Sequence, residues 1–293
     1  MDKQSEYIQS IHAIYPDLSI ETARLNQNGQ FNDILIINEE SIFRFPKTLR
    51  EATKLATETA LLRSLQRQVT LPIPNPIYAS METAAIGQVF MGYRLLPGEP
   101  FWPATLDGLT DEEQVSQLAN QLATFLHRLH TTPAEALEVR LPDFRGCEEW
   151  RALYDRFRSK LFPFMRPDAC TEVAKQFEDF LSDARNCSYA PTLIHGDFGP
   201  SNILYHARLG SISGIIDFSS AGWGDPAVDF AALLCSVSYG ERFLERFTGI
   251  YPGIEEVLPR ARFYAGTFAL QEALYGLEDG DRGAFESGIA GYR

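Results

Sequence analysis

The sequence predicts an α+β protein with two lobes, a small β-rich N-terminal lobe and a larger, mostly helical C-terminal lobe. Before Pro97, short apolar runs separated by polar turns flank one long helical pattern, and after Gly98 the chain consists mostly of helical patterns. Strands gathered at one end of a chain and helices at the other are typical of this class. We therefore expect an N-terminal lobe at residues 1–96 and a C-terminal lobe at residues 97–293.

The N-terminal lobe is expected to combine a small sheet with two helices. Pro16 ends the first helical pattern, because proline cannot continue a helix. Leu55, Leu62 and Leu65 share one face of the second pattern. The expected helices are 5–15 and 49–68, and the expected strands lie near 20–25, 34–37, 42–45, 77–78 and 89–96.

The C-terminal lobe is expected to begin with a long helix opened by Asp111-Glu112-Glu113, since acidic residues are favoured at the positive end of the helix macrodipole. Further elements follow in the sequence. They are helices at 148–161 and 171–184, short strands at 192–194 and 212–216, and helices from there to the C-terminus.

The charge of the chain limits its partners. A net charge of −13 and a pI near 4.9 argue against non-specific binding to nucleic acid or to an anionic membrane, and they are compatible with a cationic ligand. The first residues lack the apolar core of a signal peptide, and no apolar run approaches the length of a membrane span. We expect a cytoplasmic protein without a nucleic-acid or membrane partner.

The four cysteines, Cys147, Cys170, Cys187 and Cys235, form no CxxC pair. Their spacing predicts neither a zinc site nor a redox dithiol, and it favours reduced thiols.

Two segments place polar side chains directly beside apolar strands. In LIHGDFGPSNILY, Asp197 stands two residues after His195 and five before Asn202, and in SGIIDF a lone carboxylate, Asp217, directly follows an apolar strand. Transfer from a nucleoside triphosphate requires a carboxylate that accepts or orients the substrate hydroxyl, and a carboxamide and a second carboxylate that hold Mg²⁺ against the phosphates. A turn in which Asp197 caps backbone amides is the alternative for the first segment alone. The three residues in this order favour the kinase interpretation.

HGDFGPSNIL and GIIDFSSAGWGDPAVDF resemble the aminoglycoside phosphotransferase family, small-molecule kinases with a protein-kinase-like fold. FMGYRLLPGEPF adds to the likeness, which covers nearly the whole chain and is closest to the aminoglycoside 2''-phosphotransferase branch. The resemblance implies that ATP or GTP is the co-substrate. It also implies that Asp197 is the catalytic base, that Asn202 and Asp217 ligate Mg²⁺, and that His195 supports the loop from beneath.

Asp225 and Asp229 are assigned structural roles. Asp225-Pro226 has the pattern of an N-cap followed by proline in the first helical position, and Asp229 falls in the first turn of that helix. In the family this pair also braces the catalytic loop.

Arg44 is the expected phosphate-binding cation. The family carries a lysine on the third strand, where this chain has Ile42-Phe43-Arg44-Phe45-Pro46-Lys47. Strand alternation puts Arg44 on the face of Ile42, whereas Lys47 has the opposite parity and follows a proline. Glu58 lies within the apolar stripe of its helix and therefore requires a cationic partner, for which Arg44 is the candidate. A surface arginine on an edge strand is the alternative.

The remaining nucleotide contacts follow from the resemblance. The carbonyl of Arg94 and the amide of Leu96 would face the purine edge. The turn from Gln27 to Asp33 contains only one glycine, Gly29, so the sequence offers no glycine-rich fingerprint for a loop that would cover the phosphates.

The acceptor is expected to carry a hydroxyl group, and the negative charge of the chain is compatible with a cationic acceptor. Glu272, Glu278 and Asp279 are candidate cation partners, together with Asp281. The helix after Asp229 is apolar where aminoglycoside-modifying relatives carry acids, so kinases of macrolides, choline, homoserine or sugars remain alternatives. Two other classes also stay open: a non-catalytic, kinase-shaped nucleotide-binding module, and a metal-dependent hydrolase with His195, Asp197 and Asp217 as ligands.

Overall fold

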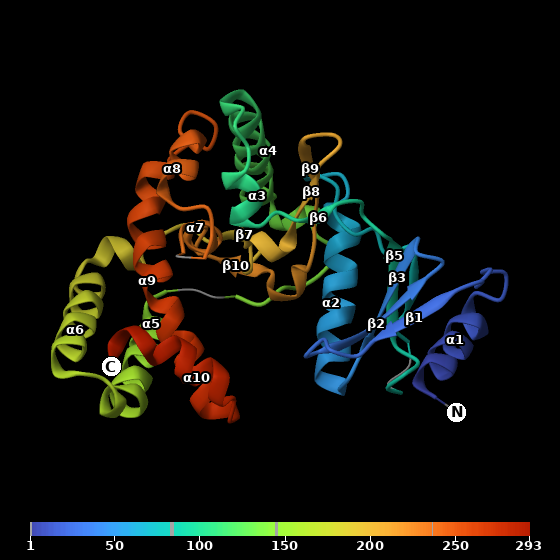
Figure 1. Ribbon diagram of the computed structural model, residues 1–293, viewed down its shortest axis with the longest axis horizontal. Coiled ribbons are helices and arrows are strands. Elements are labelled where there is room, and N and C mark those ends of the chain that lie inside the picture. Colours follow the sequence, from blue (N-terminus) through green and yellow to red (C-terminus); the bar gives the residue numbers. More distant parts are fainter. Residues whose placement is uncertain (1, 83–84, 144–145, 236) are drawn as a thin grey trace. The chain divides into compact units, whose positions relative to one another are not determined.

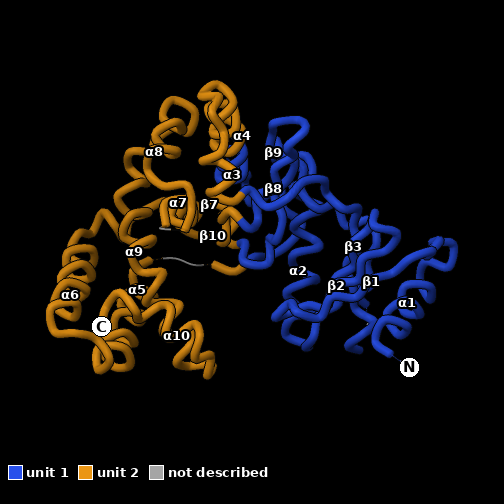
Figure 2. The backbone as a smooth tube through the Cα atoms, viewed as in Figure 1, with its two compact units in different colours: residues 1–101, 124–141, 201–221 blue, residues 102–123, 142–200, 222–293 orange. Residues whose placement is uncertain are grey.

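The computed structural model describes residues 2–82, 85–143, 146–235 and 237–293. The chain divides into two compact units (Figure 2). Unit 1 comprises residues 1–101, 124–141 and 201–221, and unit 2 comprises residues 102–123, 142–200 and 222–293. The expected division into lobes at residues 1–96 and 97–293 remains a prediction.

The main sheet of unit 1 has five antiparallel strands in the order β1-β2-β3-β5-β4. Alternating burial along NDILII shows why β2 forms, since one face of a strand is apolar and the other is not. The register pairs Ile34 with Arg44 and Asn32 with Pro46. The strands are β1 (Ala23–Asn26), β2 (Asn32–Ile37), β3 (Ser41–Pro46), β4 (Tyr78–Ser80) and β5 (Phe90–Arg94).

Two helices cover the opposite faces of this sheet (Figure 1): α1 (Lys3–Ile14) and α2 (Leu49–Leu65). The side chains of Asp2 and Thr48 cap their N-termini by accepting hydrogen bonds from backbone amides. The face toward α1 is an apolar core cluster formed by Tyr7, Ile11, Leu35, Ile37, Phe43, Phe45 and Phe90. Strand alternation turns Arg44 to the other face, toward α2.

A second, three-stranded sheet of unit 1 has the order β6-β8-β9. Its strands are β6 (Glu99–Pro100), β8 (Ile203–His206) and β9 (Ser211–Ile215). Gly98 enters this sheet with φ +112°, and a Cβ there would approach the Tyr205 carbonyl to 2.6 Å, so the position requires glycine.

Unit 2 is mainly helical, with a two-stranded sheet of β7 (Thr192–Ile194) and β10 (Gly222–Gly224). One core cluster lies among α5, α6, α9 and α10 and includes Tyr154, Phe157, Phe177, Leu270 and Leu274. The helices are α3 (Pro103–Asp107), α4 (Glu112–His130, which continues into unit 1), α5 (Glu148–Arg156), α6 (Pro167–Ser182), α7 (Ala227–Leu234), α8 (Glu241–Leu244), α9 (Ile254–Asp279) and α10 (Arg282–Ile289).

The structure confirms most expected elements and adds several. The expected helix at 148–161 is present. Its first part is the α-helix α5, and a wider π-helical segment, Phe157–Leu161, continues it. The apolar run after Asn202 indicated β8, but the sequence did not indicate β6 or β10, which have only two and three residues.

The expectation of reduced thiols was wrong for two cysteines. Cys147 and Cys187 form a disulfide with their Cα atoms 5.3 Å apart, although they are 40 positions apart in the sequence. Spacing alone gave no sign of this pair, because the fold brings together residues that are distant along the chain. Cys170 and Cys235 are free thiols.

Among the described residues, no helix is both long enough and apolar enough to cross a membrane.

Candidate active site

The HGD segment follows β7 in unit 2 and is held by α7. The carboxylate of Asp229, fully buried, accepts hydrogen bonds from the backbone N–H groups of His195 at 2.9 Å and Gly196 at 2.8 Å. Nδ1 of the buried His195 accepts from the N–H of Asp197 at 3.3 Å. Each contact fixes the backbone, and the side chain of Asp197 lies at the surface of unit 2. His195 and Asp229 therefore both contact the backbone of this loop.

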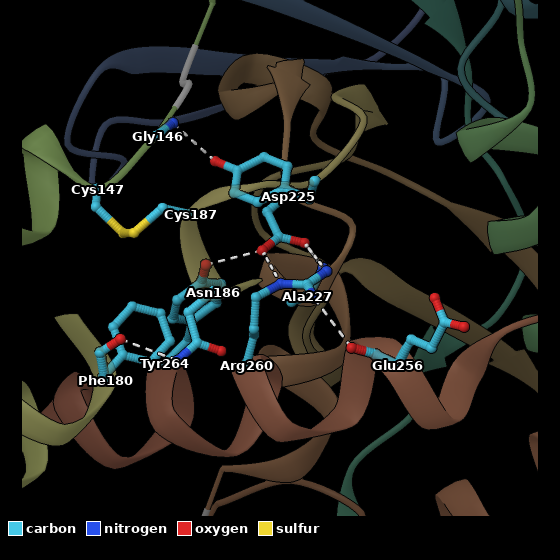
Figure 3. A network of polar contacts seen from close by, with 11 residues as sticks. Gly146, Cys147, Phe180, Asn186, Cys187, Asp225, Ala227, Glu256, Arg260 and Tyr264 are labelled. Carbon is cyan, nitrogen blue, oxygen red and sulfur yellow. Dashed lines mark hydrogen bonds and ion pairs between the residues drawn. A yellow bond between two sulfur atoms is a disulfide. The ribbon is translucent and has the colours of Figure 1, made fainter. Parts of the chain in front are cut away.

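Asp225 fixes the start of α7 to α9. Its carboxylate accepts from the Ala227 N–H at 3.0 Å, from the Arg260 guanidinium at 2.6 and 2.9 Å, and from the Tyr264 hydroxyl at 2.8 Å, as Figure 3 shows. α7 begins at Ala227, one residue later than the expected start, and the Asp225 carboxylate binds the N–H of that first residue. Burial alone would lower the pKa of Arg260, yet its bonds to Asp225 raise that pKa. The sequence gave no indication of Arg260 or Tyr264.

Asn202 and Asp217 lie on adjacent backbone segments of unit 1. The N–H of Ile216 donates to the carbonyl of Asn202 at 2.9 Å, which brings the two expected metal ligands onto neighbouring segments. Asn202 is buried, whereas 44% of the Asp217 side chain is exposed. Asp217 has φ 63° and ψ 71°, a left-handed conformation that costs energy in a non-glycine residue. Such backbone strain is found most often where function requires a particular side-chain direction.

Arg44 joins two carboxylates of unit 1. Its guanidinium lies 2.6 Å from the Glu58 carboxylate, the predicted partner, and 3.7 Å from the Asp217 carboxylate. Burial would lower the pKa of Arg44, but Glu58 raises it above the ordinary value. Burial also raises the pKa of Glu58, and Arg44 offsets only part of that shift. The guanidinium is thus kept charged beside an accessible carboxylate.

Lys47, the other cation considered for the phosphates, is bound elsewhere. Its ammonium lies 2.8 Å from the Gln27 carbonyl, 2.5 Å from the Gly29 carbonyl and 3.3 Å from the buried Asp33 carboxylate. It therefore anchors the turn between β1 and β2. This arrangement leaves Arg44 as the buried cation on the face toward α2.

Arg94 is the last residue of β5, and Leu96 lies two positions later, after Leu95. The Leu95 N–H donates to the Glu40 carbonyl at 2.7 Å, which ties this segment to the β2–β3 turn. The side chain of Arg94 is exposed, 3.9 Å from the Glu40 carboxylate. The expected purine contacts of Arg94 and Leu96 stay a prediction.

The three candidates for binding a cationic phosphoryl acceptor are exposed residues of the C-terminal half of α9, namely Glu272, Glu278 and Asp279. Glu278 is paired with Lys160 at 2.6 Å and with Arg156, and these hydrogen bonds lower its pKa. Glu272 and Asp279 lie in the same region of α9, and Asp281 caps α10. Two cations of the chain itself therefore compete with any ligand for Glu278.

Comparison with known proteins agrees with this geometry. Residues 22–264 match the model of the phosphotransferase enzyme family, so the chain belongs to that family and is a phosphotransferase. It is 32% identical over 270 residues to viomycin phosphotransferase of Streptomyces vinaceus, covering 90% of this chain and 91% of that protein.

Two solved structures extend the likeness to the whole fold. APH(2")-IIIa in complex with GDP and kanamycin has a TM-score of 0.86 and 26% identity, covering 97% of this chain and 96% of that one. Aminoglycoside 2'-phosphotransferase-IIIa with GDP has a TM-score of 0.88 and 25% identity, covering 99% and 97%. The expected α+β class and the resemblance to aminoglycoside phosphotransferases are confirmed.

Proposed function

We propose that this phosphotransferase moves the γ-phosphoryl group of ATP or GTP to a hydroxyl group of an antibiotic, with Mg²⁺ as cofactor. The observation that carries the proposal is the position of Arg44, a buried guanidinium 2.6 Å from Glu58 and 3.7 Å from the half-exposed Asp217. A fixed cation beside a carboxylate that solvent reaches is what a nucleotide phosphate and its metal ion require.

Asn202 and Asp217 are the proposed Mg²⁺ ligands. Both supply oxygen atoms, the donor type that Mg²⁺ prefers, and the Ile216–Asn202 backbone hydrogen bond keeps their segments adjacent. When bound, Mg²⁺ would neutralise charge on the phosphate oxygens. Arg44 would bind the same phosphates with a planar guanidinium that forms two parallel hydrogen bonds, where a lysine would act as a point charge.

Asp197 is the proposed catalytic base. Its carboxylate is exposed on a loop whose backbone is fixed by Asp229 and His195. A carboxylate of this kind accepts or orients the proton of the attacking hydroxyl, while the loop holds it in position without rearrangement. His195 is a poor candidate for a metal ligand, because its side chain is fully buried and its Nδ1 accepts the Asp197 N–H. That arrangement disfavours the metal-dependent hydrolase.

Antibiotics are the preferred acceptor class because the relatives named above are a viomycin phosphotransferase and an enzyme solved with kanamycin. The net charge of −13 suits a cationic acceptor. Glu272 and Asp279 are the proposed cation partners, since Glu278 already pairs with Arg156 and Lys160.

Both the proposed kinase and a non-catalytic module would bind a nucleotide, but only the kinase would transfer a phosphoryl group. Calorimetry with Mg²⁺ and either ATP or GTP is expected to detect binding to the wild type that Asp217→Ala abolishes, whereas Asp179→Ala, in a surface pair with Lys175, retains it. The acceptor panel should contain viomycin, kanamycin, a macrolide, choline, homoserine and a sugar. Nucleotide binding without transfer to any of them would favour the binding module.

A further inference from the structure

A buried carboxylate connects helix α1 to the turn between β1 and β2. Asp33 has no solvent exposure, and its Oδ2 accepts from the Lys3 ammonium at 2.9 Å and the Tyr7 hydroxyl at 2.7 Å. Its Oδ1 lies 3.3 Å from the Lys47 ammonium. Burial would raise the pKa of Asp33, but the hydrogen bonds from Lys3 and Tyr7 and the nearby Lys47 ammonium lower it below its ordinary value. The carboxylate is therefore charged and held by groups from two elements.

Lys47 contacts both Asp33 and the turn at residues 27–31. The ammonium that faces Asp33 also donates to the carbonyls of Gln27 and Gly29, and the Lys47 backbone N–H donates to the Phe31 carbonyl at 2.9 Å. Residues 27–31 are exposed, and these contacts from Lys47, which directly follows β3, hold the segment. Gly29 also packs tightly, because a Cβ there would approach the Asn32 carbonyl to 2.5 Å.

The turn lies close to Arg44 along the sheet. Asn32, which ends the turn, pairs with Pro46, and Ile34 pairs with Arg44. Pro46 lies two positions beyond Arg44 on β3, a distance of about 7 Å at the usual rise. A nucleotide whose phosphates contact Arg44 is therefore within reach of residues 27–31.

We infer that α1 positions the turn at residues 27–31 for nucleotide binding, through Tyr7, Asp33 and Lys47. The inference rests on the proposed function, because it assumes that nucleotide phosphates lie at Arg44. The family match begins at residue 22, whereas the likeness to the solved structures covers 97% and 99% of this chain and so extends into α1. Tyr7, Asp33 and Lys47 are positioning residues, since they act through the turn.

Tyr7→Phe is the most specific test. It removes the hydroxyl that donates to Asp33 but keeps the ring, which stacks on Phe45 with centroids 3.9 Å apart. We expect KM for the nucleotide to rise about threefold to tenfold, the effect of losing one hydrogen bond, with kcat changed less than about twofold. Amide hydrogen exchange of residues 27–31 should become faster. Lys47→Met, at a partly exposed side chain, should have larger effects of the same kind.

Tyr154→Phe is the matched control, because Tyr154 also stacks on a phenylalanine, Phe177, and donates to a carboxylate, Glu178, but lies in unit 2. It should leave the nucleotide KM and the exchange of residues 27–31 unchanged. Unchanged exchange in both Tyr7→Phe and Lys47→Met would overturn the inference, and so would faster exchange with an unaltered KM. A wild-type protein that binds neither ATP nor GTP would instead refute the proposed function, and the inference with it.

Discussion

Arg44 and Glu58 form an ion pair at 2.6 Å in which both side chains are nearly inaccessible to solvent. A buried ion pair contributes little net stability, because desolvation offsets the attraction between the charges. Apolar residues at both positions would serve the core at least as well. The pair is better explained by function: Glu58 orients the guanidinium toward the side of the sheet where Asp217 lies, at 3.7 Å.

Arg44→Met tests that explanation. Removing the guanidinium leaves Glu58 buried without its partner, which should lower the free energy of unfolding by about 3–5 kcal/mol and weaken nucleotide binding. The double variant Arg44→Met/Glu58→Leu should recover most of the stability but not the binding. Denaturant unfolding measures the first quantity and calorimetry the second. Recovery of nucleotide affinity in the double variant would show that Arg44 has no part in binding.

Asp197→Ala should lower kcat about 10²- to 10⁴-fold, the usual effect of losing a positioned acid–base group, with little change in nucleotide affinity. The loop should keep its shape, because its bonds to Asp229 are made by the backbone of His195 and Gly196. Steady-state kinetics at saturating nucleotide provides the measurement. A variant as active as the wild type would remove Asp197 from its assigned role.

The disulfide should stabilise unit 2. Cys147 and Cys187 close a loop of 40 residues, for which the chain-entropy model gives about 4 kcal/mol, within the observed range of about 2–5 kcal/mol for native disulfides. Cys147→Ser and reduction with a dithiol should lower the unfolding free energy by similar amounts, and reduction should have no further effect on the variant. Cys170→Ser, at a free thiol, is the control. Equal stability of the oxidised and reduced wild type would contradict the expectation.

Asp33 predicts a dependence of stability on pH. Its pKa is lower in the folded protein than the ordinary value of 3.8, so its contribution is complete above that value and is lost as the pH falls through the lowered pKa. Wild type should exceed Asp33→Asn in unfolding free energy at neutral pH, and the difference should shrink as the pH falls below about 3.8. Denaturant titrations from neutral pH down to pH about 3 follow this difference. A gap that stays constant over that range would mean that the Asp33 charge does not stabilise the fold.

Local sequence patterns predicted those residues whose orientation is set by a single strand or helix. The parity of β3 distinguished Arg44 from Lys47, and the apolar stripe around Glu58 indicated its burial and its partner. Asp217 followed its strand as expected, although its left-handed backbone was not visible in the sequence. Periodicity describes one strand or helix at a time, and that is enough for these positions.

Contacts between distant segments were not predictable in the same way. Arg260 lies 35 positions from Asp225, and no feature of α9 distinguishes it from the other charged residues of that helix. Glu278 was expected to meet a ligand, but Lys160 and Arg156, 118 and 122 positions earlier, occupy it. The cysteine pair was missed for the same reason. Such partners depend on how the helices pack, which no single segment encodes.

Phosphoryl transfer itself is the most direct test of the account. Wild type and Asp197→Ala would each be incubated with Mg²⁺, ATP or GTP, and the acceptor panel, and the products examined by mass spectrometry. The account predicts that the wild type adds one phosphoryl group to a hydroxyl of at least one antibiotic, with one nucleoside diphosphate released per product, and that Asp197→Ala forms this product far more slowly. Consumption of nucleotide without any phosphorylated acceptor, or an equal rate in the variant, would contradict it.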